Sequence, residues 1–322
     1  MAQKHDLQYL DFVEHVLNNG VVKTDRTGTG TISVSSYQMR FNLSDWSLPM
    51  LTTKKMFGRG MKREIKWYFD GETNIKSLLA DNVHIWDQWA TEAGDLGPVY
   101  GAMWRAWPDT QCVEESIVHI LQKRGYEIIH TFFVEDLNRN MCVVRKEIDQ
   151  LAEAIDLLRT TPDSRRIIIN SWNPALLPVD LKVPKNNPPL GLQALPPCHC
   201  MFQFTVLDGK LNCDLRQRSA DIGLGVPFNI AQYSLITLLI AKMVGLEPGE
   251  FVWNGVDCHI YSNHVDALKI QLARRDQEVP DSPTVRISDR VRDILPEHVE
   301  MDDMEIVGYT TPYDKLEMGV AT

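Results

Sequence analysis

Residues 229–244 limit most strongly how this chain can fold, because apolar side chains occupy nearly every face of a predicted helix. Such a helix has no side that prefers water, so other elements must surround it. The chain has 322 residues, 44% of them hydrophobic, which is enough to build that surrounding core. No uninterrupted run of 18 or more apolar residues occurs, so we expect a core helix and no membrane span.

The rest of the chain mixes strands and helices without a strict strand–helix–strand repeat. Apolar spacing predicts helices over 6–19, 60–70 and 145–159, and extended chain over 31–42. The three isoleucines at 167–169 predict a buried strand. Residues 198–206 alternate as a strand does, and Asp208-Gly209 predicts a turn into a returning strand over 211–217. This mixture favours an α+β fold in one domain, 1–322, with loops or insertions at 109–144 and 183–197.

Composition excludes several classes of function. The formal net charge is −10, which disfavours a broadly basic surface for nucleic acid. The first residues are polar and lack the apolar core of a secretory signal, so we expect a cytoplasmic protein. Six cysteines do not make a disulfide scaffold in a chain of this size, and Cys198 and Cys200 are too close for a zinc pair. We therefore expect a reduced protein with no metal and no membrane or nucleic-acid partner.

Cys198 is the candidate nucleophile, because it follows two prolines and stands beside His199. A free cysteine is most often a small buried hydrophobic residue, and that alternative stays open here. The thiolate is the reactive form, and we expect Arg216 and Arg218 on the returning strand to lower the thiol pKa. Alternation places Cys198 on the face of Phe202 and His199 on the opposite face. Neighbours on opposite faces cannot form a thiolate–imidazole pair, which argues against a cysteine hydrolase.

Asn229 stands at the start of the apolar helix, where a helix N-cap would explain it. A second interpretation is more specific, because a carboxamide has one acceptor and one donor side by side. Uracil presents N3–H and O4, which match that pair directly, whereas cytosine presents the reverse pattern. If Asn229 faces a base, it therefore indicates uracil.

Other polar and aromatic residues are weaker signals when each is taken alone. A single arginine is usually solvated, but several that converge would bind a phosphate through charge-assisted hydrogen bonds. Alternation places His259 and Tyr261 on one face of a strand, where they are either core residues or ligand contacts. Trp86 and Trp89 either fill the core or stack on a flat heterocycle.

Short motifs follow one another along the chain. They are 25–30 (DRTGTG), 51–54 (LTTK), 85–87 (IWD), 94–101 (GDLGPVYG), 162–166 (PDSRR), 197–199 (PCH), 217–219 (QRS), 221 (D), 224–225 (LG), 227–230 (PFNI) and 259–261 (HIY). In these motifs the chain resembles the thymidylate synthases, from Tyr9 almost to the C-terminus and leaving out 109–144. Many motifs in the same order make the resemblance specific. The resemblance implies an α+β fold with a large twisted mixed β-sheet packed by helices, and a homodimer formed through that sheet.

The resemblance also implies roles for the matched residues. Cys198 would add to C6 of dUMP, and C5 would then take up the methylene of 5,10-methylenetetrahydrofolate, which also supplies hydride. Arg26, Arg218 and Ser219 would bind the nucleotide phosphate, and Arg165 and Arg166 would reach the phosphate bound by the partner subunit. The implied nucleotide contacts also include His199, Gln217, Asp221, Asn229, His259 and Tyr261. The implied catalytic group is Cys198, Glu64, Tyr100, Asp221, Asn229 and Arg218. The implied folate contacts are Lys54, Ile85, Trp86, Trp89, Leu195, Asp221, Leu224, Gly225, Phe228 and Val320.

Three functions remain open from the sequence. The first is thymidylate synthesis (EC 2.1.1.45), the reductive methylation of dUMP to dTMP with release of dihydrofolate. The second is a dUMP hydroxymethylase of the same superfamily, in which water in place of hydride reaches the C5 methylene; a dry pocket disfavours it. The third is a non-catalytic ligand-binding or RNA-binding regulator, which the acidic charge and the intact nucleophile disfavour.

Gln232 stands where the family most commonly has serine.

Overall fold

A six-stranded mixed sheet organises the computed structural model, which describes residues 4–25, 28–278 and 280–320. The strand order is β1 (Val21–Lys23), β2 (Thr31–Asn42), β9 (Glu247–Tyr261), β8 (Lys210–Asp221), β7 (His199–Leu207) and β6 (Ile168–Asn170). β8 and β9 are parallel, and the other neighbours are antiparallel. Because β8 and β9 run the same way, their C-terminal ends meet at one edge of the sheet. The α+β mixed-sheet prediction is confirmed.

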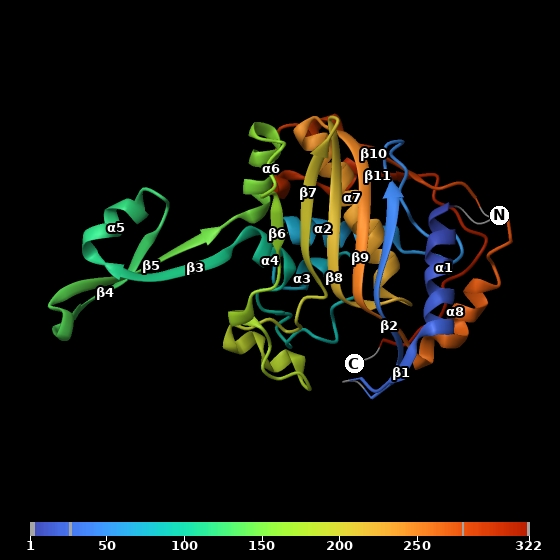
Figure 1. Cartoon of the computed structure of the whole chain (residues 1–322), viewed down its shortest axis with the longest axis horizontal. Helices are drawn as coiled ribbons and strands as arrows, with labels where there is room; N and C mark the ends of the chain where they lie inside the picture. Colours follow the sequence, from blue (N-terminus) through green and yellow to red (C-terminus); the bar gives the residue numbers. More distant parts are fainter. Residues whose placement is uncertain (1–3, 26–27, 279, 321–322) are drawn as a thin grey trace.

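Helices cover only one face of this sheet (Figure 1). They are α1 (Lys4–Asn19), α2 (Gly58–Phe69), α3 (Lys76–Ala80), α4 (Tyr100–Arg105), α6 (Gln150–Thr160), α7 (Gly225–Val244) and α8 (Val265–Leu272). The opposite face carries polar side chains that bond across strands, such as Gln38 Nε2 to Asn254 Oδ1 at 2.7 Å and Arg40 to Glu250 at 2.8 Å. A small second sheet pairs β10 (Thr284–Ile287) with β11 (Met304–Val307).

The apolar helix α7 lies at the centre of the core, as its composition predicts. Its side chains pack against β8, β9 and α2, and those of Leu235, Ile236 and Leu239 are fully buried. By length and composition alone α7 could cross a membrane, but 83% of its most apolar window is buried inside the protein. The helix starts at Gly225 and its N-cap residue is Leu224, so the prediction that Asn229 caps it is wrong. Asn229 lies one turn inside the helix.

A projecting arm replaces the loops expected at 109–144. It contains β3 (Trp107–Glu114), α5 (Glu115–Gln122), β4 (Glu127–Val134) and β5 (Arg139–Ile148), with strand order β3-β5-β4. The arm extends away from the six-stranded sheet (Figure 1). It has its own small core of Val118, Leu121, Tyr126, Cys142 and Val144. Local pairing and this core explain why a segment without long apolar periodicity is ordered.

The helix expected at 145–159 is shifted, because residues 145–148 belong to β5. α6 runs from Gln150 to Thr160, and Asp149 fixes its start by accepting a hydrogen bond from the Ala152 N–H at 2.9 Å. An aspartate cap satisfies an otherwise unpaired helix donor, and here it decides where the strand ends. The helices predicted over 6–19 and 60–70 and the strand over 31–42 are confirmed within two residues at each end, whereas the helix predicted over 229–244 begins four residues earlier, at Gly225.

A register shift at the start of β7 overturns the predicted face of His199, whereas Phe202 and Phe204 are buried on one face as predicted. The pairing with β8 shifts between His199 and Met201, which is the signature of a β-bulge. One extra residue reverses the alternation, so His199 lies on the same face as Phe202, and both rings contact Tyr233. Cys198 precedes the strand and lies in a bend. The alternation argument for separating Cys198 from His199 therefore does not hold at this site.

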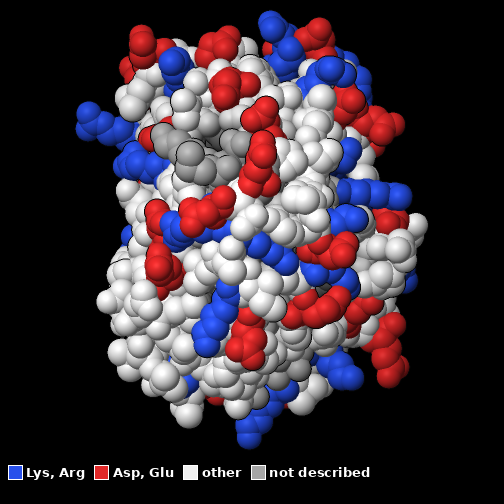
Figure 2. Space-filling model, turned by 90° about the vertical axis from the view of Figure 1, so that its right-hand side faces the viewer, with Lys and Arg blue, Asp and Glu red and all other residues white. Residues whose placement is uncertain are grey.

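On the face that carries α1 and α8, acidic and basic side chains are interspersed (Figure 2). Arg275 of this region pairs with Asp11 at 2.5 Å and with Glu14 at 3.1 Å. Such alternation presents no single-sign field to a nucleic acid on this side of the molecule.

Candidate active site

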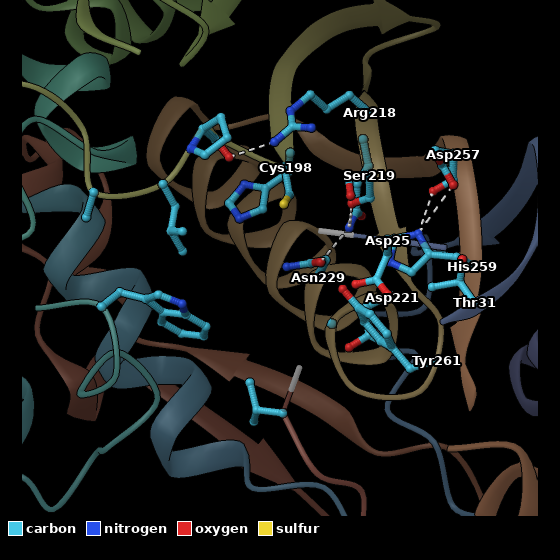
Figure 3. Close-up of a pocket in the computed structure, with 18 of the residues that line it drawn as sticks. Asp25, Thr31, Cys198, Arg218, Ser219, Asp221, Asn229, Asp257, His259 and Tyr261 are labelled. Carbon is cyan, nitrogen blue, oxygen red and sulfur yellow. Dashed lines mark hydrogen bonds and ion pairs between the residues drawn. The ribbon is translucent and has the colours of Figure 1, made fainter. Parts of the chain in front are cut away.

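A cavity of about 620 Å³ opens where the C-terminal ends of β8 and β9 meet the start of α7. Asp221 ends β8, Tyr261 ends β9, and Asn229 lies in the second turn of α7; all three face this space (Figure 3). The predicted residues that line the cavity are Glu64, Trp86, Trp89, Tyr100, Leu195, Cys198, His199, Gln217, Arg218, Ser219, Asp221, Gly225, Asn229, His259, Tyr261 and Val320. Glu64 and Val320, which are 256 positions apart in the sequence, thus line the same cavity.

Six predicted residues lie elsewhere. Arg165 and Arg166 are exposed and do not line this cavity. Ile85 is exposed, and Leu224 and Phe228 are half-buried; none of the three lines the cavity. Lys54 is buried, and its ammonium donates to the Gly223 carbonyl at 2.6 Å, so it does not reach the cavity. Arg26 lies outside the described residues.

The bend that carries Cys198 is held from two sides. The Tyr100 hydroxyl oxygen accepts a hydrogen bond from the Cys198 N–H at 3.0 Å. Arg218 donates from Nε to the Pro197 carbonyl at 2.8 Å and from Nη2 to the Pro196 carbonyl at 2.9 Å. Its guanidinium also lies over the Trp172 ring, 5.1 Å from the ring centroid. These contacts fix the thiol beside a guanidinium in the cavity (Figure 3).

The predicted lowering effect of Arg218 on the pKa of Cys198 is present, but burial outweighs it. Burial raises the pKa of Cys198, and the Arg218 charge and a hydrogen bond with Ser219 oppose that effect without cancelling it. Arg216 is exposed and does not line the cavity. The thiol is therefore largely protonated before a ligand binds, and its activation depends on groups that arrive with or around that ligand.

His199 is buried and neutral. Burial lowers the pKa of His199 to about 3, so the ring does not become an imidazolium near neutral pH. Its Nδ1 hydrogen-bonds the Tyr233 hydroxyl at 2.7 Å, and the ring stacks on Tyr100 with centroids 4.0 Å apart. A ring with this pKa cannot stabilise a thiolate as a cation, so the cysteine hydrolase alternative is disfavoured on electrostatic grounds.

A hydrogen-bond relay fixes the orientation of the Asn229 carboxamide. The indole N–H of Trp253 donates to Gln217 Oε1 at 2.8 Å, which leaves the Gln217 amide nitrogen pointing toward the cavity side. That nitrogen donates to Asn229 Oδ1 at 3.0 Å. Turning the Asn229 amide over would set two donors against each other. The Asn229 Nδ2 donor and the remaining lone pair of Oδ1 are thus available as a donor–acceptor pair.

The comparison with known protein families agrees with this geometry. The family model described as "Thymidylate synthase" matches residues 7–322, essentially the whole chain. The chain belongs to the thymidylate synthase family. Membership implies a methyltransferase-type enzyme that binds dUMP and uses a folate co-substrate. In the described residues no group of three or more His, Cys, Asp or Glu side chains is placed to hold a metal ion.

In this thymidylate synthase family member, Glu64 is surrounded by side-chain donors. Tyr68 Oη donates to Oε1 at 2.9 Å and Trp86 Nε1 donates to the same oxygen at 2.8 Å. Gln232, the residue that stands in place of the usual serine, donates to Oε2. Burial raises the pKa of Glu64, and these three hydrogen bonds oppose the rise. Tyr68 and Gln232 were not predicted as site residues, although Tyr68 follows Glu64 by one helical turn.

Replacing Gln232 with serine is expected to raise the pKa of Glu64 further. Serine is too short to reach Oε2, so the carboxylate loses a donor while its burial remains. If the reaction needs the ionised carboxylate, the acid limb of the kcat/KM profile for dUMP moves to higher pH and the alkaline limb stays. The matched control is Ser234→Ala on the same helix, because the Ser234 hydroxyl is buried without a partner. An unmoved acid limb in Gln232→Ser would contradict the role given to this hydrogen bond.

The C-terminal segment is tied to the cavity through His264. His264 Nε2 donates to the Gly319 carbonyl at 2.7 Å, and Nδ1 lies 3.5 Å from Asp221 Oδ1. Both partners are acceptors, so the doubly protonated ring suits them best. Burial works to lower the pKa of His264, but the Asp221 carboxylate and the Gly319 carbonyl outweigh it, and the pKa is raised. Val320, next to Gly319, lines the cavity.

This contact predicts a pH-dependent attachment of the C-terminus. Because the folded-state pKa of His264 is raised, its stabilising contribution is present at low pH and is lost as pH rises through that pKa. Trimming by a carboxypeptidase, normalised to an unstructured peptide, should be several-fold slower at pH 6 than at pH 8. The His264→Gln variant keeps a donor for Gly319 but does not titrate, and its normalised rates should agree at both pH values. The assignment is refuted if the ratio of the trimming rate at pH 8 to that at pH 6 is the same in the wild type and in His264→Gln.

Asp257 is a site residue that the sequence did not identify. Its carboxylate pairs with Lys23 at 2.6 Å and lies 3.4 Å from His259 Nδ1, and all three residues line the cavity. The His259 and Tyr261 rings meet edge to face with centroids 5.1 Å apart, which agrees with their predicted common face. The alternation that pairs His259 with Tyr261 includes Asp257 as well, so that signal was present in the sequence.

Proposed function

We propose that this protein is a thymidylate synthase (EC 2.1.1.45) that converts dUMP to dTMP with 5,10-methylenetetrahydrofolate and releases dihydrofolate. The observation that carries the proposal is the common cavity of the Cys198 thiol and the oriented Asn229 carboxamide (Figure 3). Attack at C6 of uracil requires two things: a nucleophile, and a hydrogen-bonding pair that matches the base.

The residues then divide the chemistry as follows. Cys198 Sγ adds to C6, and the electron pair of the C5–C6 double bond moves toward O4, where Asn229 Nδ2 donates a hydrogen bond. Burial holds the free thiol protonated, so Cys198 enters the step as the thiol and its proton passes to O4 as the bond to C6 forms. Tyr100, hydrogen-bonded to the Cys198 backbone, is close enough to help remove the C5 proton afterwards. Glu64 assists proton transfers at O4.

The cavity fits a folate beside the nucleotide. When bound, 5,10-methylenetetrahydrofolate supplies one carbon and a hydride to C5. Trp86, Trp89 and Leu195 give the cavity an apolar wall, with Gly225 and Val320 at its far side. Asp221 accepts from the Gly223 N–H at 3.0 Å and faces the cavity, where it would hold the pterin.

A homodimer completes the phosphate site in this proposal. Arg218 and Ser219 line the cavity of their own chain. Among the described residues, Arg218 donates two of its five N–H groups to the carbonyls of Pro196 and Pro197, which leaves the others for a phosphate. Arg165 and Arg166 are exposed and do not line the cavity of their own chain. The polar sheet face that no helix covers in Figure 1 is the surface through which two chains would exchange these arginines.

The runner-up is the dUMP hydroxymethylase, and product analysis separates the two. Trp86 donates to Glu64 and meets Trp89 edge to face, so aromatic rings form the wall beside this carboxylate. Such a wall favours hydride over water as the group that adds to the C5 methylene. Incubation with dUMP and methylenetetrahydrofolate should give dTMP and dihydrofolate in equal amounts. Recovery of 5-hydroxymethyl-dUMP with tetrahydrofolate would overturn the proposal. A parallel incubation with dCMP should give no product.

A further inference from the structure

The projecting arm exposes an unusual share of the apolar surface. Within residues 107–148, seven large hydrophobic side chains are exposed: Ile117, Ile120, Ile128, Ile129, Phe132, Phe133 and Leu137. Four of them belong to the single strand β4. Apolar side chains gathered on one projecting element mark an interaction site, whereas scattered ones do not.

β4 is also an open edge. In the described part of the chain it pairs only with β5, so the backbone groups along its other side have no partner strand. The ladder has one bulge at Ile129 and continues regularly from His130 to Val134. α5 packs mainly on β5 and β3. A strand of this kind is a template for another strand.

Each face of β4 carries an exposed phenylalanine, Phe133 on one and Phe132 on the other. Thr131 pairs with Cys142, whose side chain lies in the arm's core under α5, so Thr131 and Phe133 point to the α5 side. His130 and Phe132 point to the other side, where their rings stack with centroids 5.7 Å apart. A partner strand would therefore cover hydrophobic side chains on both faces of the sheet.

Charge at the two ends of β4 indicates which partner fits. Lys123 and Arg124 precede the strand, and Glu135 and Asp136 follow it. All four side chains are exposed, and no ion pair found in the described chain involves any of them. In an antiparallel pair of identical strands, the beginning of one lies opposite the end of the other. Basic flanks then meet acidic flanks twice, whereas parallel pairing would oppose like charges.

We propose that β4 is a self-association edge, which pairs antiparallel with β4 of a second copy of this chain to form one continuous sheet across two arms. The contact is isologous, so each copy gives and receives the same interactions. It lies on the arm, away from the uncovered face of the six-stranded sheet (Figure 1), and it adds to any dimer formed there. The proposal is independent of the reaction the cavity performs.

Sedimentation velocity over about 1–100 µM tests this edge. The wild-type chain should form a larger species than Ile129→Lys, since a lysine on an edge strand opposes pairing. Ile129 is 57% exposed, so the substitution removes little packing. Its matched control is Ile270→Lys on α8, because Ile270 is 54% exposed and far from the arm. That control should behave as wild type, and all variants should retain wild-type turnover at low concentration.

A charge swap then tests the orientation. Lys123→Glu with Arg124→Glu makes both flanks acidic and should disrupt the larger species. Adding Glu135→Lys and Asp136→Lys restores complementarity in the antiparallel arrangement and should restore the larger species at low salt. The proposal is overturned if wild type and Ile129→Lys have the same size at every concentration, or if the fourfold swap fails to restore what the twofold change removed. If β4 instead binds an unrelated protein, the purified wild type will have the same size as Ile129→Lys, and that result counts against the proposal.

Discussion

Serine in place of Cys198 is expected to lower kcat/KM for dUMP by at least about 10⁴-fold. The hydroxyl is a far weaker nucleophile than the thiol it replaces. The side chain keeps nearly the same shape, and the backbone contacts to Tyr100 and Arg218 that hold the bend remain. The loss should therefore fall on kcat, with dUMP binding nearly unchanged. Steady-state kinetics and equilibrium binding of dUMP measure the two quantities separately.

Exchange of the C5 hydrogen gives a second readout for Cys198. Addition of the sulfur to C6 makes C5 basic, and reversal of that addition after a proton is taken from D₂O leaves deuterium at C5 of dUMP. The wild-type enzyme should catalyse this exchange, and Cys198→Ser should not. The control is Cys200→Ser two positions away, because Cys200 does not line the cavity. If Cys198→Ser keeps more than about a tenth of wild-type turnover, another group is the nucleophile.

Aspartate in place of Asn229 is expected to reverse the choice of base. The donor to O4 disappears, and a buried site that loses a matched donor discriminates by about 10²–10⁴-fold in kcat/KM against the former substrate. A carboxyl group accepts from the cytosine amino group and, when protonated, donates to N3. Gln217 can still donate to one carboxyl oxygen, so the relay from Trp253 is retained. The measurement is the ratio of kcat/KM for dUMP to that for dCMP.

Asn229→Ala is the control for this reversal. Without any side-chain donor or acceptor, the variant should lose discrimination while it favours neither base strongly. If Asn229→Asp reverses the ratio of kcat/KM for dUMP to that for dCMP, and Asn229→Ala brings this ratio close to one, then the Asn229 side chain recognises the base. Retention of the wild-type preference for dUMP in Asn229→Asp would show that the base is recognised by other groups.

The parts of the fold that the sequence predicted are those with strong local patterns. The all-round apolar helix had to be central, and α7 is buried on every side. The alternation of 31–42 was confirmed as β2 at the predicted bounds. Errors occurred where a single residue decided a boundary: Asp149 starts α6, and the extra residue in β7 moves His199 to the core face. Periodicity averages over several residues, so it does not detect such local events.

The sequence predicted most of the residues that form the site, but not the effects of burial and charge on them. The family resemblance predicted sixteen residues that line the cavity, including Cys198 and Asn229. The sequence could not show that burial outweighs Arg218 at the Cys198 thiol, or that Lys54 points to the Gly223 carbonyl. Desolvation and charge separation depend on distances between segments that are far apart in the chain.

The sequence by itself determined which chemical groups the chain possesses and which elements must be buried, because residue identity and short-range periodicity are properties of adjacent positions. Only the tertiary structure decided how those groups act. It oriented the Asn229 amide through Trp253 and Gln217, placed three donors on Glu64, linked His264 to the C-terminal segment, and left the β4 edge open. Hydrogen-bond direction, burial and the partners of a charge arise from contacts between distant segments, and those exist only once the chain has folded.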